Sequence, residues 1–369
     1  MEPFKNLYSY ENSKKISKAL KRAWADFPSA VFLKHLENQL RPLELKDRMK
    51  LLSERLGRTL PKDFPTKVDI LVRALAENEK DTVGLSGFLV WPLTSLVARE
   101  GLDHFEISMD ALKEMTKRFT AEFDIRPFLE KHEKKSLRLL KKWAKDPDPH
   151  VRRLVSEGTR PLLPWGSRLS RFQNDPAKTL NLLEILKKDD SEYVRRSVAN
   201  HLNDHSKTHG DWVLERLRAW RRKDPDHPGL GWIVKHASRT LVKAGHPGAL
   251  LLHGFSDGAE LRIKRLELAP KSLKVGESLT FSVRISNPTS KPVSVLVDYV
   301  IHHRKANGRL APKVFKGRKK VLQPRETWSF DGVHKIRKVT TRAYFEGEHL
   351  FALQINGRSS KTQAFRLRL

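Results

Sequence analysis

The 369-residue chain contains no cysteine, which excludes disulfide bonds, thiolate metal sites and cysteine nucleophiles and suits a reducing compartment. Long apolar segments are also missing. The longest, residues 84–98, is too short to span a membrane and contains Pro92, so we expect a buried helix and turn there. The first fifteen residues lack the apolar core of a secretory signal, and we therefore expect a cytoplasmic protein without a membrane anchor.

Acidic residues are few relative to basic ones: 43 Asp or Glu face 72 Lys or Arg, giving a formal charge of +29. Such a chain attracts polyanions over long distances. The basic residues are spread along the sequence and form no isolated amphipathic segment of the kind that anchors proteins on anionic membranes. Nucleic acid is therefore the favoured partner. With 38% hydrophobic residues, the chain is expected to be folded and globular.

Several cofactor and catalytic motifs are absent as well. There is no glycine-rich phosphate loop and no G-x-S-x-G motif, so neither a nucleotide cofactor nor a serine hydrolase is indicated. His201, His205 and His209 follow one another at helical spacing, but no glutamate stands in the metalloprotease position and no cysteine is present. We therefore expect no metal and no cofactor.

Hydrophobic periodicity divides the chain into two parts. From Lys14 to about His253, apolar residues recur at helical spacing, with short polar or proline-containing breaks. After residues 253–260 the segments alternate between apolar and polar residues or are β-branched, and turn residues separate them. We predict an α + β multidomain protein: an all-α helical-repeat solenoid over residues 1–255, and an antiparallel immunoglobulin-like β-sandwich over residues 256–369.

An internal repeat lies within the helical part. Residues 146–156, DPDPHVRRLVS, align without gaps with residues 189–199, DDSEYVRRSVA, at an offset of 43. This period is typical of HEAT-type repeats, whose paired helices stack into a solenoid with a concave binding face. The V-R-R segments are expected to open the second helix of each pair, which lines that face. On the helix after Ser191, three apolar residues at i, i+4 and i+8 are expected to be buried, and three polar residues form another stripe. The apolar set is Val194, Val198 and Leu202, and the polar set is Arg196, Asn200 and Asp204.

Longer motifs carry a resemblance to a known family. The segments AEFDIRPFLEKH, HVRRLVSEGTRPLLPWGSRL and YVRRSVANHLNDHSK, followed by GRLAPKVFKGRKKVL and TRAYFEGEHLFALQINGR, resemble the bacterial AlkC DNA glycosylases, relatives of the HEAT-like AlkD enzymes. The resemblance runs from about Trp91 to the C-terminal residue and includes the form with an immunoglobulin-like extension. It implies excision of N3-alkylated bases, chiefly 3-methyladenine and 3-methylcytosine, from duplex DNA.

Two carboxylates suit this reaction. An N3-alkylated base is a cation that leaves as a neutral molecule without a general acid, so the barrier lies in the oxocarbenium-like sugar. A fixed carboxylate in a dry cleft stabilises that charge and orients the attacking water. The resemblance implies that Glu122 and Asp204 are these residues. Spacing alone favours a simpler interpretation, in which Glu122 caps a helix starting near Asp124 or balances its charge, and Asp204 pairs with Arg196.

Trp165 lies between Pro164 and Gly166, in a loop rather than on an apolar helical stripe. An indole ring attracts both a cationic base and a cationic sugar. The resemblance places this tryptophan in the catalytic site, where its ring contacts the lesion nucleotide. The alternative is a tryptophan that fills the end of a helix pair, because tryptophan side chains are often largely buried.

Basic and amide side chains near the two repeats are candidate DNA ligands. Each phosphate neutralised by such a residue releases counterions, which makes binding strong, salt-dependent and independent of sequence. Any single one could instead solvate a helix face or pair with a neighbouring acid. The residues predicted to contact DNA here are Arg153, Arg160, Arg168, Arg195, Arg196, Asn200 and Asn203.

The strand-rich part holds more than half of the net charge, since residues 260–369 contain 24 Lys or Arg against 8 Asp or Glu, or +16. Residues 302–320 are expected to form a hairpin with Asn307-Gly308 at its turn. We predict that Lys313, Lys316 and Arg318 contact DNA. An alternative role for these lysines is to prevent edge-to-edge pairing of strands.

The interpretation that follows is a monofunctional DNA-3-methyladenine-type glycosylase, a hydrolase without a cofactor, whose partner is double-stranded DNA containing alkylated bases. No lysine is marked as a Schiff-base nucleophile, so no lyase step is expected. We expect a monomer. The rival interpretation is a non-catalytic HEAT-repeat nucleic-acid-binding or scaffold protein, which the composition supports equally well.

Overall fold

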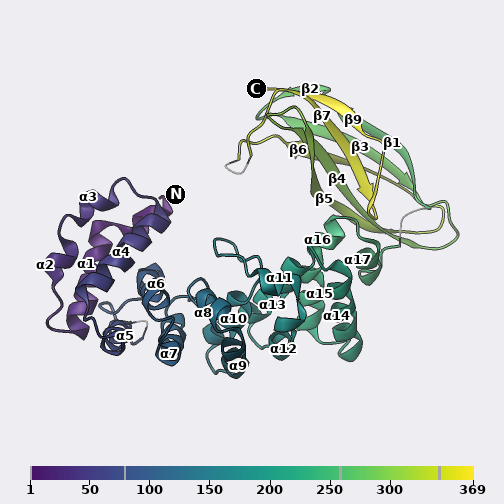
Figure 1. Ribbon diagram of the computed structural model, residues 1–369. Coiled ribbons are helices and arrows are strands. Elements are labelled where there is room, and N and C mark those ends of the chain that lie inside the picture. Colours follow the sequence, from purple (N-terminus) through teal and green to yellow (C-terminus); the bar gives the residue numbers. More distant parts are fainter. Residues whose placement is uncertain (1, 79, 257–259, 340–341) are drawn as a thin grey trace. The chain divides into compact units, whose positions relative to one another are not determined.

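The computed structural model describes residues 2–78, 80–256, 260–339 and 342–369, which divide into two compact units (Figure 1). The first unit comprises Met1–His205 and His227–Ile233, and the second comprises Ser206–Asp226 and Val234–Leu369. Helix gives way to strand between Leu252 and Arg262, which brackets the boundary predicted at 255/256. The compact units divide the chain differently, because helical residues between 206 and 252 also belong to the unit that contains the sandwich. Residues 257–259, within the segment 253–260 where the periodicity changes, lie outside the described residues.

The first unit is helical, as predicted. Pro92 lies in the first turn of its helix, where its missing N–H costs nothing, and the preceding residues form a 3₁₀ turn, which confirms the helix-and-turn prediction. The helices and 3₁₀ turns are η1 (Phe4–Tyr8), α1 (Tyr10–Ala23), α2 (Ser29–Leu33), α3 (Leu36–Leu40), α4 (Leu45–Thr59), α5 (Phe64–Arg73), η2 (Gly87–Val90), α6 (Trp91–Glu100), α7 (Phe105–Thr116), α8 (Arg126–Lys131), α9 (Glu133–Trp143), α10 (Pro149–Gly158), α11 (Ser170–Asn174), α12 (Ala177–Leu186) and α13 (Glu192–His205).

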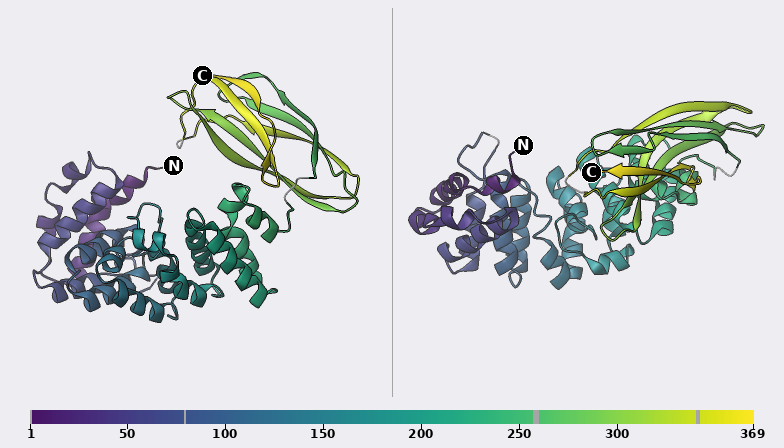
Figure 2. Two further views of the ribbon diagram at one scale, coloured as in Figure 1. Left: turned by 45° about the vertical axis from the view of Figure 1, so that its right-hand side comes forward. Right: turned by 90° about the horizontal axis from the view of Figure 1, so that it is seen from above.

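The 43-residue repeat corresponds to two helix pairs, α9/α10 and α12/α13. Helix α10 packs against α13, and α9 packs against α12, so the first helices form one layer and the V-R-R helices form the other (Figures 1 and 2). The aspartate that begins each copy of the repeat binds a cation from a preceding helix. Asp189 binds Arg152 through both oxygens, at 2.6 and 2.9 Å, and Asp146 accepts from Lys113 of α7 at 2.7 Å. These contacts link successive pairs of the stack.

The second unit begins with helices and ends with a β-sandwich. Its elements are α14 (Gly210–Lys223), α15 (Pro228–Ala237, shared with the first unit), α16 (Arg239–Lys243), α17 (Pro247–Leu252), β1 (Arg262–Ala269), β2 (Ser272–Lys274), β3 (Ser278–Ser286), β4 (Val293–Arg304), β5 (Leu310–Leu322), β6 (Thr327–Lys335), β7 (Gly347–Ile355), β8 (Arg358–Ser359) and β9 (Gln363–Arg368). One sheet has the order β1-β3-β6 and the other β2-β9-β7-β4-β5, with β8 beside β7. All pairs are antiparallel except β2–β9.

Alternating apolar residues of both sheets fill the sandwich core. Phe281 of β3 lies against Phe351 of β7, with ring centroids 4.9 Å apart, and Tyr299 of β4 stacks on Phe351 at 5.6 Å. The predicted hairpin joins β4 and β5 and turns at residues 305–309, where Gly308 has a φ of +77° that suits glycine.

The sandwich and its neighbouring helices meet at two glycines. A Cβ atom on Gly245 would lie 2.7 Å from the Cα atom of Gly357, closer than real Cβ contacts allow. Beside this contact, Gln354 of β7 donates a hydrogen bond to the carbonyl of Lys243 in α16 at 3.3 Å. The absence of both side chains lets the two backbones touch, so these last helices pack with the sandwich.

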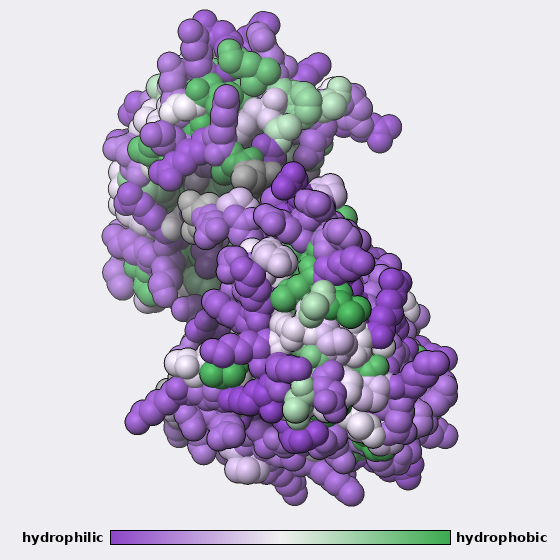
Figure 3. All heavy atoms as spheres, turned by 90° about the vertical axis from the view of Figure 1, so that its left-hand side faces the viewer, coloured by the Kyte–Doolittle hydropathy of each residue, from purple (hydrophilic) through white to green (hydrophobic). Residues whose placement is uncertain are grey.

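The face seen in Figure 3 is mostly hydrophilic, with small separate hydrophobic areas. Across the described ranges, no helix combines the length and the apolar character needed to cross a lipid bilayer.

Candidate active site

Glu122 is held at the N-terminal side of the repeats by two donors that bind the same oxygen. It lies in the turn before α8 and is 8% exposed. Its Oε2 accepts a hydrogen bond from Thr120 at 2.8 Å and forms an ion pair with Arg153 of α10. Oε1 makes no hydrogen bond within the described part of the chain. Helix α8 begins at Arg126 without a side-chain cap, so the alternative in which Glu122 caps that helix is not seen.

A third carboxylate, that of Glu157, lies on the other side of Arg153 from Glu122 and contacts the same guanidinium. Glu157 Oε1 lies 3.4 Å from Nη2 of Arg153 and accepts from Nη1 of Arg160 at 2.7 Å. Its other oxygen accepts from the hydroxyl of Ser197 on α13 at 2.5 Å. Nε of Arg160 then donates to Oδ2 of Asp204 at 2.9 Å. The side chains form a continuous row of alternating charge, which we call the acid–arginine row: Glu122, Arg153, Glu157, Arg160 and Asp204.

The row is largely buried, and its carboxylates raise the pKa of both of its arginines. Asp204 is 3% and Glu157 is 5% exposed. Burial by itself lowers the pKa of a guanidinium, yet the pKa of Arg160 is raised, because Asp204 and Glu157 outweigh the loss of solvent. Three acids and two arginines leave one negative charge in excess, inside a strongly basic chain. The structure therefore brings the two predicted catalytic acids into one network.

Asp204 differs from its prediction in two ways. The three apolar residues of its helix are buried as expected, each 0% exposed. The polar residues of the helix, however, do not share one environment: Arg196 is exposed, Asn200 is half-buried and Asp204 is buried. Arg196 pairs with Glu192 at 2.5 Å, so the suggested pair between Arg196 and Asp204 is wrong. The actual partner, Arg160, comes from the other repeat, which spacing within one helix cannot reveal.

Trp165 projects from the loop that follows α10. It is 57% exposed, which rules out the alternative of a tryptophan filling the end of a helix pair. Its backbone has a φ of +67°, uncommon for any residue except glycine. Lys46 of α4 donates a hydrogen bond from Nζ to the Trp165 carbonyl at 2.8 Å. The loop begins beside Arg160, so the exposed indole and the acid–arginine row are joined by a few residues of backbone.

Tyr193 is a second exposed aromatic residue near the row and was not predicted. It is 43% exposed at the start of α13, and the Arg153 guanidinium lies 5.0 Å from its ring centroid. Glu157 and Arg126 were not singled out from the sequence either. The sequence does contain a pattern that could have identified Glu157. It stands four residues after Arg153 and three before Arg160, a spacing that predicts one shared helix face and ion pairs with both arginines.

The predicted DNA ligands fall into separate environments. Arg153 and Arg160 are bound in the row, and Arg195 donates to the carbonyls of Asp189 and Asp190 in its own turn. Arg168 is exposed and forms no ion pair or side-chain hydrogen bond with any residue the structure describes. Arg196 is exposed too, apart from its surface pair. Asn200 is half-buried and Asn203 is buried, both on the helix that carries Asp204.

In the sandwich, the three predicted ligands lie on β5, the edge strand of its sheet. Lys313, Lys316 and Arg318 are all exposed. Two of them lean on aromatic rings: Lys313 Nζ is 5.4 Å from the Phe315 centroid, and the Arg318 guanidinium is 5.1 Å from that of Phe330. The edge position keeps the edge-protection alternative open.

Of the three histidines at helical spacing, His201 and His205 lie on α13, whereas His209 precedes α14. Both ring nitrogens of fully buried His201 are used, with Ser156 O at 3.0 Å and Thr179 Oγ1 at 3.2 Å. Among the described residues, no group of three or more His, Asp or Glu side chains is arranged to hold a metal ion.

Comparison with known proteins identifies both parts of the chain. Residues 110–240 match the family described as DNA alkylation repair enzyme, and residues 262–369 match the C-terminal Ig-like domain of the uncharacterised protein YhaZ. The chain is 37% identical over 358 residues to the uncharacterized protein YhaZ of Bacillus subtilis (strain 168), with 97% of each chain covered. It is 36% identical to the alkylpurine DNA glycosylase AlkC of Pseudomonas fluorescens, solved bound to DNA containing an abasic site analog, with a TM-score of 0.92 and 100% of both chains covered.

These similarities extend over the helical part and the sandwich alike, so they concern the whole architecture and not a shared module. They agree with the helical part and the immunoglobulin-like sandwich described above. The chain belongs to the AlkC-like DNA alkylation repair proteins of the YhaZ family, which carry a C-terminal immunoglobulin-like domain.

Proposed function

We propose that this protein is a monofunctional DNA glycosylase that hydrolyses the N-glycosidic bond of cationic N3-alkylated bases, 3-methyladenine and 3-methylcytosine, in duplex DNA. The observation that carries the proposal is the acid–arginine row, which holds two acids at opposite ends in a buried, charge-ordered network. Membership of the AlkC-like family supports the reaction class.

The proposed chemistry needs no general acid. The alkylated base already carries a positive charge, so it departs as a neutral molecule and leaves an oxocarbenium-like sugar. Carboxylates in a site of low dielectric stabilise that cation far better than carboxylates in water. In this proposal, the carboxylates at the two ends of the row supply this stabilisation.

Glu122 and Asp204 then have different tasks. Both donors to Glu122 bind Oε2, which leaves Oε1 as an acceptor for the attacking water. We assign water positioning to Glu122 and stabilisation of the sugar cation to Asp204. The exposed ring of Trp165 packs against the lesion nucleotide, where its electron-rich face attracts the positive charge.

DNA binding is assigned to basic residues around the row and on the sandwich. Arg168 and Arg196 are exposed and suited to phosphates, and Arg195, Asn200 and Asn203 stand on the same helix as Asp204. Arg153 and Arg160 act through the carboxylates that they bind. Lys313, Lys316 and Arg318 form a second group of phosphate ligands on β5.

The test is single-turnover release of free methylated base from alkylated duplex DNA. We expect Glu122→Gln and Asp204→Asn each to lower the rate by about 100-fold or more while duplex binding persists. The matched control is Glu106→Gln on α7, which removes an exposed carboxylate paired with Lys135 and is expected to keep the wild-type rate.

Unchanged base release in both acid variants would refute the assignment of the two acids. Absence of base release from the wild-type protein, with duplex binding intact, would instead support the non-catalytic binding protein. Binding is measured in the same samples, so loss of affinity is not mistaken for loss of chemistry.

A further inference from the structure

Arg126 is a fully buried arginine whose guanidinium, among the residues that the structure describes, donates hydrogen bonds to backbone carbonyls alone. It stands at the first position of α8 and is 0% exposed. Nη1 donates to the carbonyls of Gly158 and Arg160, each at 2.9 Å, and Nη2 donates to the carbonyl of Ser167. These acceptors lie at the two ends of residues 158–167, the segment that carries Trp165. One side chain therefore closes the base of the tryptophan loop.

Placing a cation there is costly. Burial lowers the pKa of Arg126 to about 10, and its Nε finds no hydrogen-bond partner within the described residues. An apolar side chain of similar size would avoid this cost. What the guanidinium adds is a rigid fork of donors that reaches three carbonyls at once, which neither lysine nor an apolar residue reproduces.

The loop needs such a restraint because Trp165 is in a sparsely populated backbone conformation. A residue other than glycine at a φ of +67° is strained and persists only where the surrounding structure holds it in that conformation. The hydrogen bond from Leu169 N to Pro161 O, 3.2 Å long, also crosses the loop. Lys46 binds the Trp165 carbonyl from outside. Arg126 is the inner tether, and exposed Lys46 is the outer one.

We propose that Arg126 is a positioning residue for the glycosylase reaction, which fixes the exposed Trp165 ring at the lesion by holding both ends of its loop. The inference rests on the proposed function, in which Trp165 contacts the lesion nucleotide. Arg126 is fully buried, so it is assigned no direct contact with DNA or with the reacting atoms. It also binds the carbonyl of Arg160, whose side chain holds Asp204, so the loop and the acid are set by one buried group.

The first measurement does not depend on activity. Chymotrypsin cleaves after tryptophan, but a tethered loop resists cleavage because several residues must open together. In the full-length Arg126→Lys variant, the fragment ending at Trp165 is expected to appear at least about tenfold faster than in the wild type, as followed by mass spectrometry. Trp165→Ala removes that cut and identifies it. Equal cleavage rates in the variant and the wild type would overturn the proposal.

The second measurement is a double-mutant cycle on base release. Arg126→Lys and Trp165→Ala are each expected to slow single-turnover release, and the double variant is expected to match Trp165→Ala within about twofold. If the fold-reductions in the rate of base release multiply in the double variant, Arg126 does not act through Trp165. Lys46→Ala, at an exposed position, tests the outer tether in the same way should Arg126→Lys fail to fold. If the wild type releases no base, the proposed function fails, while the cleavage experiment still decides whether Arg126 holds the loop.

Discussion

Glu157 is the residue on which the two halves of the acid–arginine row depend. It is the only member that touches both arginines, and it lies between the two acids assigned to the reaction. Neither arginine is surrounded by water, since Arg160 is 7% exposed and the Arg153 side chain is 15% exposed. Removing the central charge would leave two buried cations facing each other across the gap, which the low dielectric makes unfavourable.

We therefore predict that Glu157→Gln destabilises the helical unit by on the order of 3 kcal/mol, because it removes one partner from a buried ion-pair network. Urea unfolding followed by far-UV circular dichroism measures the change. Glu106→Gln, which breaks an exposed ion pair, is expected to cost less than about 1 kcal/mol. Equal, small losses for the two variants would mean that the row contributes no more than surface pairs do.

At the scale of elements, the β-sandwich encloses three histidines on different strands. His303 of β4, His334 of β6 and His349 of β7 are 4%, 8% and 1% exposed. Burial, together with the positive charge of Arg342, lowers the pKa of His303 to about 3 and that of His334 to about 4, and burial lowers the pKa of His349. All three are neutral in the folded sandwich at neutral pH. Their rings form part of its packed interior.

This burial predicts a sandwich that loses stability in mild acid. Below about pH 6.5 these histidines bind protons in the unfolded chain but remain neutral in the folded sandwich. The contribution of the neutral histidines to the free energy of unfolding is therefore fully present above that pH, and it is lost as the pH falls toward the pKa values of the folded state. The decline is at most about 1.4 kcal/mol per pH unit for each histidine. Urea series at about pH 7 and about pH 5, with pulsed hydrogen exchange of the β4 and β7 peptides, measure it.

His349→Phe is expected to lessen this decline, because one of the three protonation sites is removed. His302→Phe is the control, since His302 is half-buried on the opposite side of β4 from His303. A sandwich equally stable at both pH values would contradict the buried, neutral state of these rings.

The sequence predicts the elements better than it predicts how they contact one another. The V-R-R repeat places α10 and α13, and the buried valines at positions 151 and 194 follow from helical periodicity. The partner of Asp204 could not be found this way, because Arg160 reaches it across two helices. The role of Arg126 could not be predicted for a similar reason. In the sequence it is one of 72 basic residues, and the carbonyls that it binds come together only in the folded loop. The loop position of Trp165 was predictable, since proline and glycine on either side keep it out of a helix, but its exposure could not be separated from a buried alternative by sequence alone.

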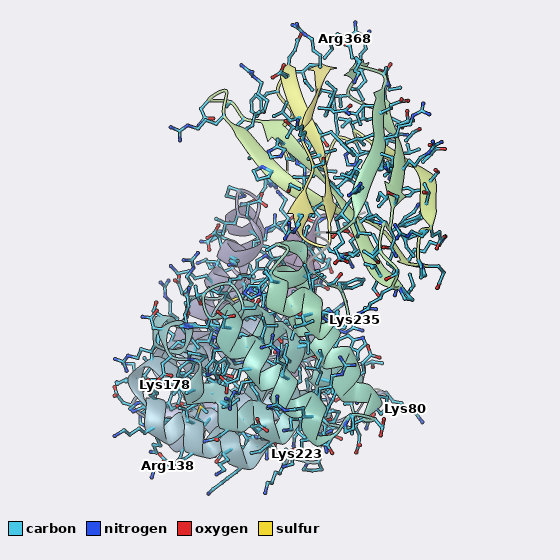
Figure 4. The ribbon with its side chains drawn as sticks, turned by 90° about the vertical axis from the view of Figure 1, so that its right-hand side faces the viewer. Lys80, Arg138, Lys178, Lys223, Lys235 and Arg368 are labelled. Atoms are coloured by element: carbon cyan, nitrogen blue, oxygen red, sulfur yellow. The ribbon has the colours of Figure 1, made fainter. Side chains whose placement is uncertain are left out.

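At the scale of the whole molecule, the charge of +29 is divided unevenly, with the strand-rich part holding +16. Part of the helical charge lies on helices that contribute no residue to the row. Arg138 and Lys178, labelled in Figure 4, extend from α9 and α12, the first helices of the two pairs. The basic residues of β5 are instead concentrated on one edge strand. Long-range attraction depends on the total charge, whereas binding depends on the phosphates that are contacted.

Replacing Lys313, Lys316 and Arg318 by serine is therefore predicted to weaken duplex binding and to reduce the slope of log affinity against log salt by about 0.9 for each phosphate that the strand no longer neutralises. The matched control replaces Lys134, Arg138 and Lys141, three exposed basic residues of α9. It removes the same charge, and its slope is expected to stay near that of the wild type. If both triple variants reduce the slope equally, β5 acts only through the general field and the edge-protection role remains for its lysines.

The order of charges along the row has a consequence for how such a site can coexist with DNA. Three bare carboxylates would push phosphates away at the very place where the backbone must approach most closely. In the proposed reaction, the guanidinium between each neighbouring pair of acids would reduce that repulsion for an incoming strand. A group with its own positive charge, such as an alkylated base or the sugar it leaves behind, would still be attracted to the carboxylates, so that charge would favour the lesion over an undamaged base.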